Sequence, residues 1–237
     1  MNSGRRSEAT KMRERPGKRD QAILADAMHY RLTTNEFVRE RFLPDSTENA
    51  TTKVTSRLVR DGWLSSHTLV DKRLYFTPGS LCVKQFGVPP SRLRPLGVQA
   101  LATSLSIASY CLDPGRQGQL LGSKLFENAW SWIPVKLRSR PYTVDAVEGV
   151  PTLKIIRVDL GGNPEHVANK CVHDLKVRCD IPGFKSLLSQ RRFVLVVLTT
   201  TESKKQLIMR SLQKRTWPNN TRFEIVEISD LCKLLSS

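Results

Sequence analysis

The chain has 237 residues, a length that usually corresponds to about two domains. It has 38 Lys and Arg residues against 22 Asp and Glu residues; the resulting net charge of +16 favours polyanions over neutral metabolites as partners. Its five cysteines, odd in number and irregularly spaced, do not form a disulfide framework, so we expect a reducing, cytoplasmic location. The charged N-terminus and the short apolar runs predict neither secretion nor a membrane span.

The charge is distributed unevenly along the chain. Residues 1–19 carry seven basic and two acidic side chains, whereas residues 20–79 carry eight of each. Residues 80–140 have eight basic against two acidic residues, and residues 141–237 have fifteen against ten. We interpret residues 1–19 as a disordered basic arm, which contributes to DNA binding only if a DNA-binding domain follows it.

Three short helices are predicted over residues 20–30, 35–42 and 47–61, from apolar residues at helical spacing and from Ser or Thr caps. On the third helix, Ala50, Val54 and Leu58 form an apolar stripe that we expect to face inward. Polar and basic residues lie off this stripe: Thr52, Lys53, Ser56, Arg57 and Arg60.

An alternating stretch after Gly62 predicts a β-hairpin whose tip carries Lys72 and Arg73. Three helices followed by a hairpin are the order of a winged helix-turn-helix, here over residues 20–79. This arrangement predicts binding to double-stranded DNA, with the third helix in the major groove and the hairpin on the neighbouring backbone. The predicted DNA contacts are Lys53, Arg57, Arg60, Thr52, Ser56, Lys72 and Arg73. A protein-interaction role is the alternative, because the charges of residues 20–79 balance.

Residues 80–140 are predicted to be a partly helical connector that packs on the following domain. Prolines interrupt the stretch, and an almost entirely apolar run over residues 98–112 predicts a buried helix.

Residues 141–237 predict an α/β domain with a mixed sheet. We expect strands over residues 142–147, 152–159, 192–199 and 223–228, and helices over residues 165–177, 184–188, 202–215 and 229–235. The continuous apolar run in residues 192–199 is typical of a central strand that is buried on both faces.

Short motifs in both halves carry a family resemblance. They are Arg57–Leu64 leading to Tyr75–Gly79, then Arg157–Gly161, Val194–Thr201 and Ile228–Leu231. On these motifs the chain resembles the replication-relaxation family of bacterial plasmids and mobile elements. The resemblance implies a restriction-endonuclease-like domain over residues 141–237 and a role in plasmid replication, DNA mobilisation or transcriptional control of a mobile element. A homodimer, or contacts with replication or mobilisation proteins, would fit that role.

A nuclease of that fold needs carboxylates that hold a divalent metal ion and a lysine near the attacking water. Asp145 and Asp159 are the candidate metal-binding and catalytic residues for Mg²⁺, with Lys170 as the candidate cation. However, Arg157 stands where the family usually has Glu, and Gly161 occupies the usual position of the lysine. We therefore expect a non-catalytic domain without a cofactor. Two alternatives for the function of the protein are a metal-dependent nuclease or nickase and an adaptor of a mobilisation complex.

Overall fold

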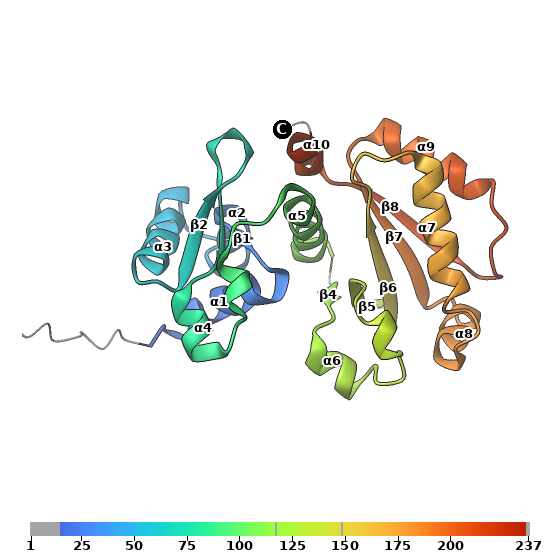
Figure 1. Cartoon of the computed structure of the whole chain (residues 1–237), viewed down its shortest axis with the longest axis horizontal. Helices are drawn as coiled ribbons and strands as arrows, with labels where there is room; N and C mark the ends of the chain where they lie inside the picture. Colours follow the sequence, from blue (N-terminus) through green and yellow to red (C-terminus); the bar gives the residue numbers. More distant parts are fainter. Residues whose placement is uncertain (1–14, 117, 148, 236–237) are drawn as a thin grey trace, which may run out of the picture.

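The structure is a computed structural model that describes residues 15–116, 118–147 and 149–235. It begins with α1 (Lys18–Tyr30), β1 (Thr33–Thr34), α2 (Asn35–Phe42), α3 (Glu48–Arg60), β2 (Leu64–Thr68) and β3 (Leu74–Pro78). β3 lies between β1 and β2 and pairs with both in the antiparallel sense. The three helices pack against this sheet around Ile23, Leu24, Val38, Leu58 and Phe76. We call residues 18–93 the N-terminal module (Figure 1).

The start and end signals in the sequence account for the bounds of these helices. The Thr34 hydroxyl accepts a hydrogen bond from the backbone NH of Phe37, and Thr47 caps α3 in the same way through Ala50. Gly62, just after α3, has a φ of 83°, a left-handed conformation that glycine adopts without strain. The three predicted helices and the hairpin are confirmed. The predicted arm ends earlier than expected, because α1 already begins at Lys18.

The segment expected to be a connector is divided between the two halves of the molecule. It contains α4 (Ser80–Phe86), α5 (Val98–Leu112), β4 (Gln119–Leu120) and α6 (Ser123–Asn128), with short 3-10 turns at Pro90–Leu93 and Val135–Leu137. α4 and the first turn pack on β2 and β3. α5, whose bounds match the predicted buried helix, lies between the N-terminal module and the second sheet (Figure 1).

The second half, the α/β domain (residues 119–235), is built on a mixed sheet of order β4-β5-β6-β7-β8. Its further elements are β5 (Tyr142–Val147), β6 (Val150–Val158), α7 (Pro164–Lys176), α8 (Pro182–Ser189), β7 (Phe193–Thr199), α9 (Glu202–Gln213), β8 (Arg222–Glu227) and α10 (Ser229–Leu235). β4, β5 and β6 are antiparallel, whereas β6, β7 and β8 are parallel. The mixed α/β fold predicted from the sequence is therefore present.

The sheet of the α/β domain is covered on both faces, as the apolar sequence of β7 predicted. Leu195 and Val197 point into a core formed with α7, α8 and α9. Val194, Val196 and Leu198 point into a second core, formed with α5 and α10. Every residue of β7 is buried. We call α7, α8 and α9 the helix layer; it lies on the side of the sheet away from α5 (Figure 1).

The second core also joins the two halves of the molecule. Tyr30, Leu32, Leu69 and Tyr75 of the N-terminal module belong to the same apolar cluster as α5 and α10. The module and the domain therefore share buried surface instead of being separated by a free linker. Within the described residues, no helix combines the length and the hydropathy that a membrane span requires.

Candidate nucleic-acid interface

One side of α3 is exposed and carries polar and basic side chains. Thr51, Thr55 and Leu58 are its buried residues, so the inner face is rotated slightly from the predicted stripe of Ala50, Val54 and Leu58. Ala50 and Val54 are only partly buried. The exposed side is formed by Glu48, Asn49, Thr52, Lys53, Ser56 and Arg60, with Glu48 at the start of the helix as its one acid.

Hydrogen bonds to Asn35, the first residue of α2, explain how a threonine occupies the inner face of α3. The Thr55 hydroxyl donates to the Asn35 Oδ1 atom at 2.8 Å, which satisfies a buried polar group. The Asn35 amide in turn donates to the Thr52 hydroxyl at 3.4 Å. These bonds fix the rotation of α3 on α2, and thereby the set of side chains that α3 presents outward.

Of the α3 residues predicted to contact DNA, Arg57 is already engaged within the protein. Its guanidinium donates to both carboxylate oxygens of Asp20, at 3.0 and 2.9 Å. The Asp20 side chain is only 8% exposed, whereas that of Arg57 is 40% exposed. Arg57 therefore ties α3 to α1, and its charge is largely balanced by Asp20.

Lys53 and Arg60 are more accessible than Arg57. The Arg60 side chain is 75% exposed, and its Nε atom lies 3.6 Å from a carboxylate oxygen of Asp61, a surface pair of little energetic weight. Lys53 lies on the exposed side of α3, next to Thr52 and Ser56. These four side chains form the part of α3 best placed to contact a ligand in solvent.

The two predicted residues at the hairpin tip differ in their surroundings. Lys72 is exposed and has a φ of 63°, which turns the chain between β2 and β3. Arg73 instead donates to both carboxylate oxygens of Asp230 in α10, at 2.8 and 3.2 Å. This bidentate pair docks the hairpin tip on the α/β domain.

The carboxylates predicted to share a metal ion lie far apart. Asp145 pairs with Thr152 in the register of β5 and β6, whereas Asp159 follows the last residue of β6. Asp159 lies seven positions after Thr152 along an extended strand, which corresponds to roughly 20 Å. The predicted metal site of Asp145 and Asp159 is therefore not formed in this conformation.

Asp159 is a buried turn residue whose oxygens have partners. One oxygen accepts from the backbone NH groups of Gly161 and Gly162, at 3.2 and 3.1 Å. The other accepts from the Thr199 hydroxyl at 3.2 Å and lies 4.0 Å from the Lys204 ammonium. Asp159 thus holds the turn after β6 against the end of β7.

Lys170, the third predicted catalytic residue, lies on the exposed side of α7. It lines a cavity of about 440 Å³ together with Asp159, His166 and Arg140. Since Asp159 is 2% exposed and directed into its turn, the cavity wall is dominated by basic and neutral groups. Among the described residues, no three His, Cys, Asp or Glu side chains come together as a metal site would require.

Arg157 takes part in an ion-pair triad with the buried Asp174 and Arg178. Its Nε atom donates to the Asp174 carboxylate, whose other oxygen lies 3.3 Å from the Arg178 guanidinium. Asp174 and Arg178 are each 1% exposed. Arg178 also donates to the Tyr142 hydroxyl at 2.8 Å. Arg157 therefore joins β6 to α7 through a salt bridge.

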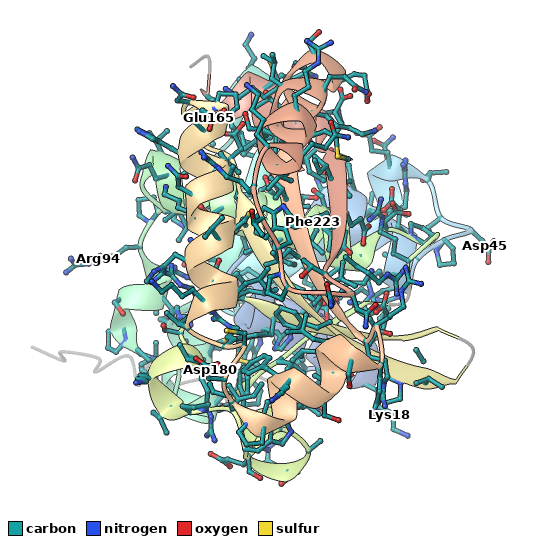
Figure 2. All side chains as sticks on the ribbon, turned by 90° about the vertical axis from the view of Figure 1, so that its right-hand side faces the viewer. Lys18, Asp45, Arg94, Glu165, Asp180 and Phe223 are labelled. Atoms are coloured by element: carbon teal, nitrogen blue, oxygen red, sulfur yellow. The ribbon has the colours of Figure 1, made fainter. Side chains whose placement is uncertain are left out.

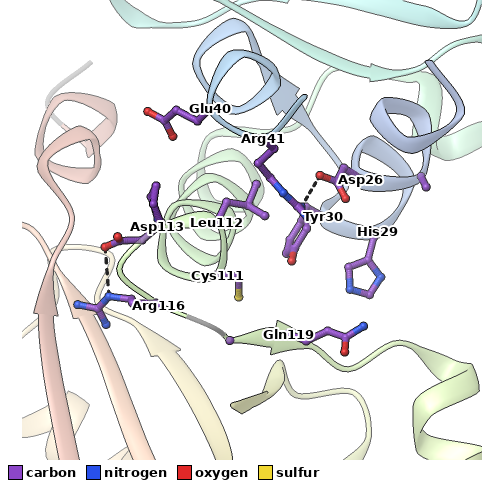
Figure 3. Close-up of a pocket in the computed structure, with 13 residues that line it drawn as sticks. Asp26, His29, Tyr30, Glu40, Arg41, Cys111, Leu112, Asp113, Arg116 and Gln119 are labelled. Carbon is purple, nitrogen blue, oxygen red and sulfur yellow. Dashed lines mark hydrogen bonds and ion pairs between the residues drawn. The ribbon is translucent and has the colours of Figure 1, made fainter. Parts of the chain in front are cut away.

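The cavity in Figure 3, of about 630 Å³, lies between α1, α2 and the segment after α5. Asp26 and Arg41 form an ion pair on one wall, and Asp113 and Arg116 form another at 3.3 Å. Burial raises the pKa of Asp26 despite the nearby charges of Arg41 and His29. These two ion pairs balance four of the charges on the walls, and Glu40 also lines the cavity.

Asp145, the other predicted metal ligand, belongs to a polar cluster on the α5 side of the sheet. The Lys154 ammonium lies 2.7 Å from Asp145, 2.9 Å from Glu224 and 3.0 Å from the Tyr110 hydroxyl. Burial alone would raise the pKa of Glu224, but the hydrogen bond and charge of Lys154, the Tyr110 bond and the Arg116 charge together lower it. This cluster ties β5, β6 and β8 to α5.

The lowered pKa of Glu224 leads to a pH-dependent contribution to stability. The folded protein binds fewer protons at this carboxyl than the unfolded chain, so the contribution is present above the ordinary pKa of 4.5 and is lost as the pH falls through the lowered value. We expect the difference in unfolding free energy between wild type and Glu224→Gln to shrink as the pH falls from about 7 to about 3. Urea unfolding at each pH measures it; a difference that stays constant or grows would contradict the prediction.

Comparison with protein-family models, curated proteins and solved structures found no match to this chain.

Proposed function

We propose that this protein binds double-stranded DNA through its N-terminal module, acting as a winged helix-turn-helix with α3 in the major groove. The observation that carries the proposal is the arrangement of α3. Its polar and basic side faces solvent, while its other side is fixed on α1, α2 and the β1-β3-β2 sheet. An α-helix fits the major groove of B-DNA, and side chains on its exposed side can reach base edges there.

The side chains on α3 suit two kinds of contact. Asn49, Thr52 and Ser56 carry amide and hydroxyl groups that can hydrogen-bond to base edges. Lys53 and Arg60 can bind guanine or the phosphates on either side of the groove. Arg57 and Arg73 have a different part in this proposal: paired with Asp20 and Asp230, they hold α3 and the hairpin in place.

The α/β domain is proposed to be non-catalytic. Asp145 is paired with Lys154, Asp159 is enclosed in its turn, and the two lie near opposite ends of β6. A role in plasmid replication, DNA mobilisation or transcriptional control, which the resemblance to the replication-relaxation family implies, stays a prediction. Neither Mg²⁺ nor another cofactor has a part in the proposal.

A role as a protein-interaction adaptor is the second candidate. It is favoured by the balance of eight basic and eight acidic residues in residues 20–79, and by the use of Arg57 and Arg73 in internal ion pairs. DNA binding and adaptor function differ in their salt dependence, because only binding to DNA releases the counterions condensed on its phosphates.

The experiment that tests the proposal is a titration of two labelled duplexes with the full chain at several salt concentrations. One duplex has a random sequence, and the other has the sequence upstream of the gene that encodes this chain. Fluorescence anisotropy should give a binding constant whose logarithm falls linearly and steeply with the logarithm of the salt concentration. An adaptor would leave the anisotropy unchanged or give only weak binding. Incubation of supercoiled plasmid with Mg²⁺ or Mn²⁺ in parallel separates binding from nicking.

The basic arm provides a further prediction. Residues 1–14, which lie outside the described part of the chain, carry four basic and two acidic side chains. Their removal should weaken binding to all duplexes alike and reduce the slope against salt by up to roughly 0.9 for each phosphate that the arm neutralises. Anisotropy titrations of the shortened chain on two unrelated duplexes measure both effects. A changed sequence preference with an unchanged slope would contradict the prediction.

A further inference from the structure

The segment that contains the helix layer of the α/β domain is more basic than the N-terminal module. Residues 164–215, which include α7, α8 and α9, contain eleven Lys and Arg residues and four Asp and Glu residues, a net charge of +7. The N-terminal module, residues 18–93, contains twelve Lys and Arg residues and eight Asp and Glu residues, a net charge of +4. If the N-terminal module is the DNA-binding half, the larger positive charge lies at a different surface.

The exposed side of α7 carries cationic and neutral groups. It is formed by His166, Asn169, Lys170, His173 and Lys176. Of the two acids within α7, Asp174 is buried in its ion pair with Arg157 and Arg178. The other, Glu165, binds Ser211 and Arg215 and so ties the start of α7 to α9. Figure 2 shows Glu165 and Asp180 near the two ends of α7, so acids border this surface instead of interrupting it.

The exposed side of α9 also carries mainly polar and basic side chains. It is formed by Glu202, Ser203, Gln206, Leu207, Arg210 and Gln213, and the exposed Lys214 follows directly after the helix. Glu202, at the start of the helix, is bound by the Lys205 ammonium and the Gln206 amide. Leu207, which is 47% exposed, is the one large apolar side chain among them. Val177, just after α7, is 37% exposed and is a second large apolar side chain at this surface. A surface of mainly cations and polar groups with two apolar side chains is suited to a phosphate backbone and has fewer apolar side chains than a helix anchored in a membrane interface.

The helix layer and α3 are held at fixed positions on opposite ends of the molecule. In Figure 1 they lie at the two ends of its longest axis, with α5 between them. The shared core around α5 and the pair of Arg73 with Asp230 connect the two halves. Because of these contacts, one duplex lying in contact with α3 leaves the helix layer exposed.

We propose that the exposed sides of α7 and α9 bind the phosphate backbone of a second DNA duplex, so that one molecule bridges two DNA segments. This inference rests on the proposed binding of a first duplex at α3. We expect these contacts not to depend on the base sequence of the DNA. Lys170, Lys176, Arg210 and Lys214 would bind phosphates, which are the same in every duplex.

The test uses one duplex fixed to beads and a second, labelled duplex of unrelated sequence in solution. Wild type should capture the labelled duplex on the beads. The variant Lys170→Gln/Lys176→Gln/Arg210→Gln/Lys214→Gln should bind the fixed duplex with an affinity within about twofold of wild type. It should capture at least about tenfold less of the labelled duplex, because it lacks the cations that displace counterions from the phosphates of that duplex. The control Lys124→Gln/Lys136→Gln, on exposed residues outside both surfaces, should behave as wild type. Thermal unfolding shows that each variant is folded.

The outcomes separate the two proposals. Capture that persists in the fourfold variant overturns the bridging inference, whether dimerisation or another surface causes it. A second result would also overturn the bridging inference, in favour of a membrane partner. In that case the wild type binds anionic vesicles, the fourfold variant does not, and both capture the labelled duplex equally. Wild type that binds one duplex and captures no second one overturns the inference and leaves the proposed function intact. Wild type that binds no duplex overturns both.

Discussion

Replacement of Asp174 by asparagine is expected to lower the free energy of unfolding by about 3–5 kcal/mol, because it leaves the buried Arg178 and the partly buried Arg157 without their anion. Asp174 is 1% exposed and receives hydrogen bonds from both Arg157 and Arg178. Asparagine keeps the shape but removes the charge. The rings of Tyr142 and Phe184, 5.4 and 5.7 Å from the Arg178 guanidinium, stabilise a cation there too weakly to replace a carboxylate.

Urea unfolding followed by circular dichroism measures this effect. The matched control is Asp180→Asn, the same change at an exposed residue four positions after the end of α7, which should alter stability by less than about 0.5 kcal/mol. A loss below about 1 kcal/mol in Asp174→Asn would show that water or a rearranged arginine compensates the charge, and would contradict the burial of the triad.

The double variant Lys53→Gln/Arg60→Gln is expected to weaken binding to duplex DNA by about 2–4 kcal/mol, at about 1–3 kcal/mol for each specific contact. Both side chains lie on the exposed side of α3, and neither is needed to hold the helix in place. This choice excludes Arg57, since its removal would leave the nearly buried Asp20 carboxylate without its partner and so disturb the fold as well.

Anisotropy titration of the double variant measures its affinity, with Lys124→Gln/Lys136→Gln as the control of equal charge change. The control should stay close to wild type if the loss comes from α3 itself. Equal losses in both double variants would mean that net charge, and not the exposed side of α3, governs the affinity.

The bounds of helices and strands could be predicted from local sequence signals. Thr34, Thr47 and Gly62 mark helix ends through caps and a left-handed turn, and the apolar run of β7 indicates its central position. The two-residue strand β1 was not predicted, because a strand of this length has no periodicity of its own. Its two threonines pair with Phe76 and Tyr75, residues more than forty positions away.

The candidate interface was predicted only in part, since it depends on contacts between distant residues. Thr55 is polar and would ordinarily favour an exposed position, but Asn35 satisfies its hydroxyl and allows it to be buried. Arg57 and Arg73 were expected to be available for DNA, and the sequence does not indicate that Asp20 and Asp230 come within reach of them.

The separation of Asp145 and Asp159 has a different cause. Both lie near the ends of predicted strands, and the fold that the chain resembles would bring two such carboxylates together. The observed register instead places Asp145 opposite Thr152, near the start of β6, while Asp159 follows its end. In an antiparallel pair the C-terminal ends of the two strands lie at opposite ends, so the pairing of β5 with β6 itself keeps these two carboxylates apart.

The claim that α3 enters the major groove is tested most directly by photo-cross-linking from its exposed side. With p-benzoylphenylalanine in place of Ser56, irradiation of the complex should join the chain to bases of the bound duplex, and unlabelled duplex should compete for the product. The same photoreactive residue in place of Ser123, exposed at the start of α6, should give little product. Cross-linking from position 123 without cross-linking from position 56 would contradict the assignment of α3 as the DNA-contacting helix.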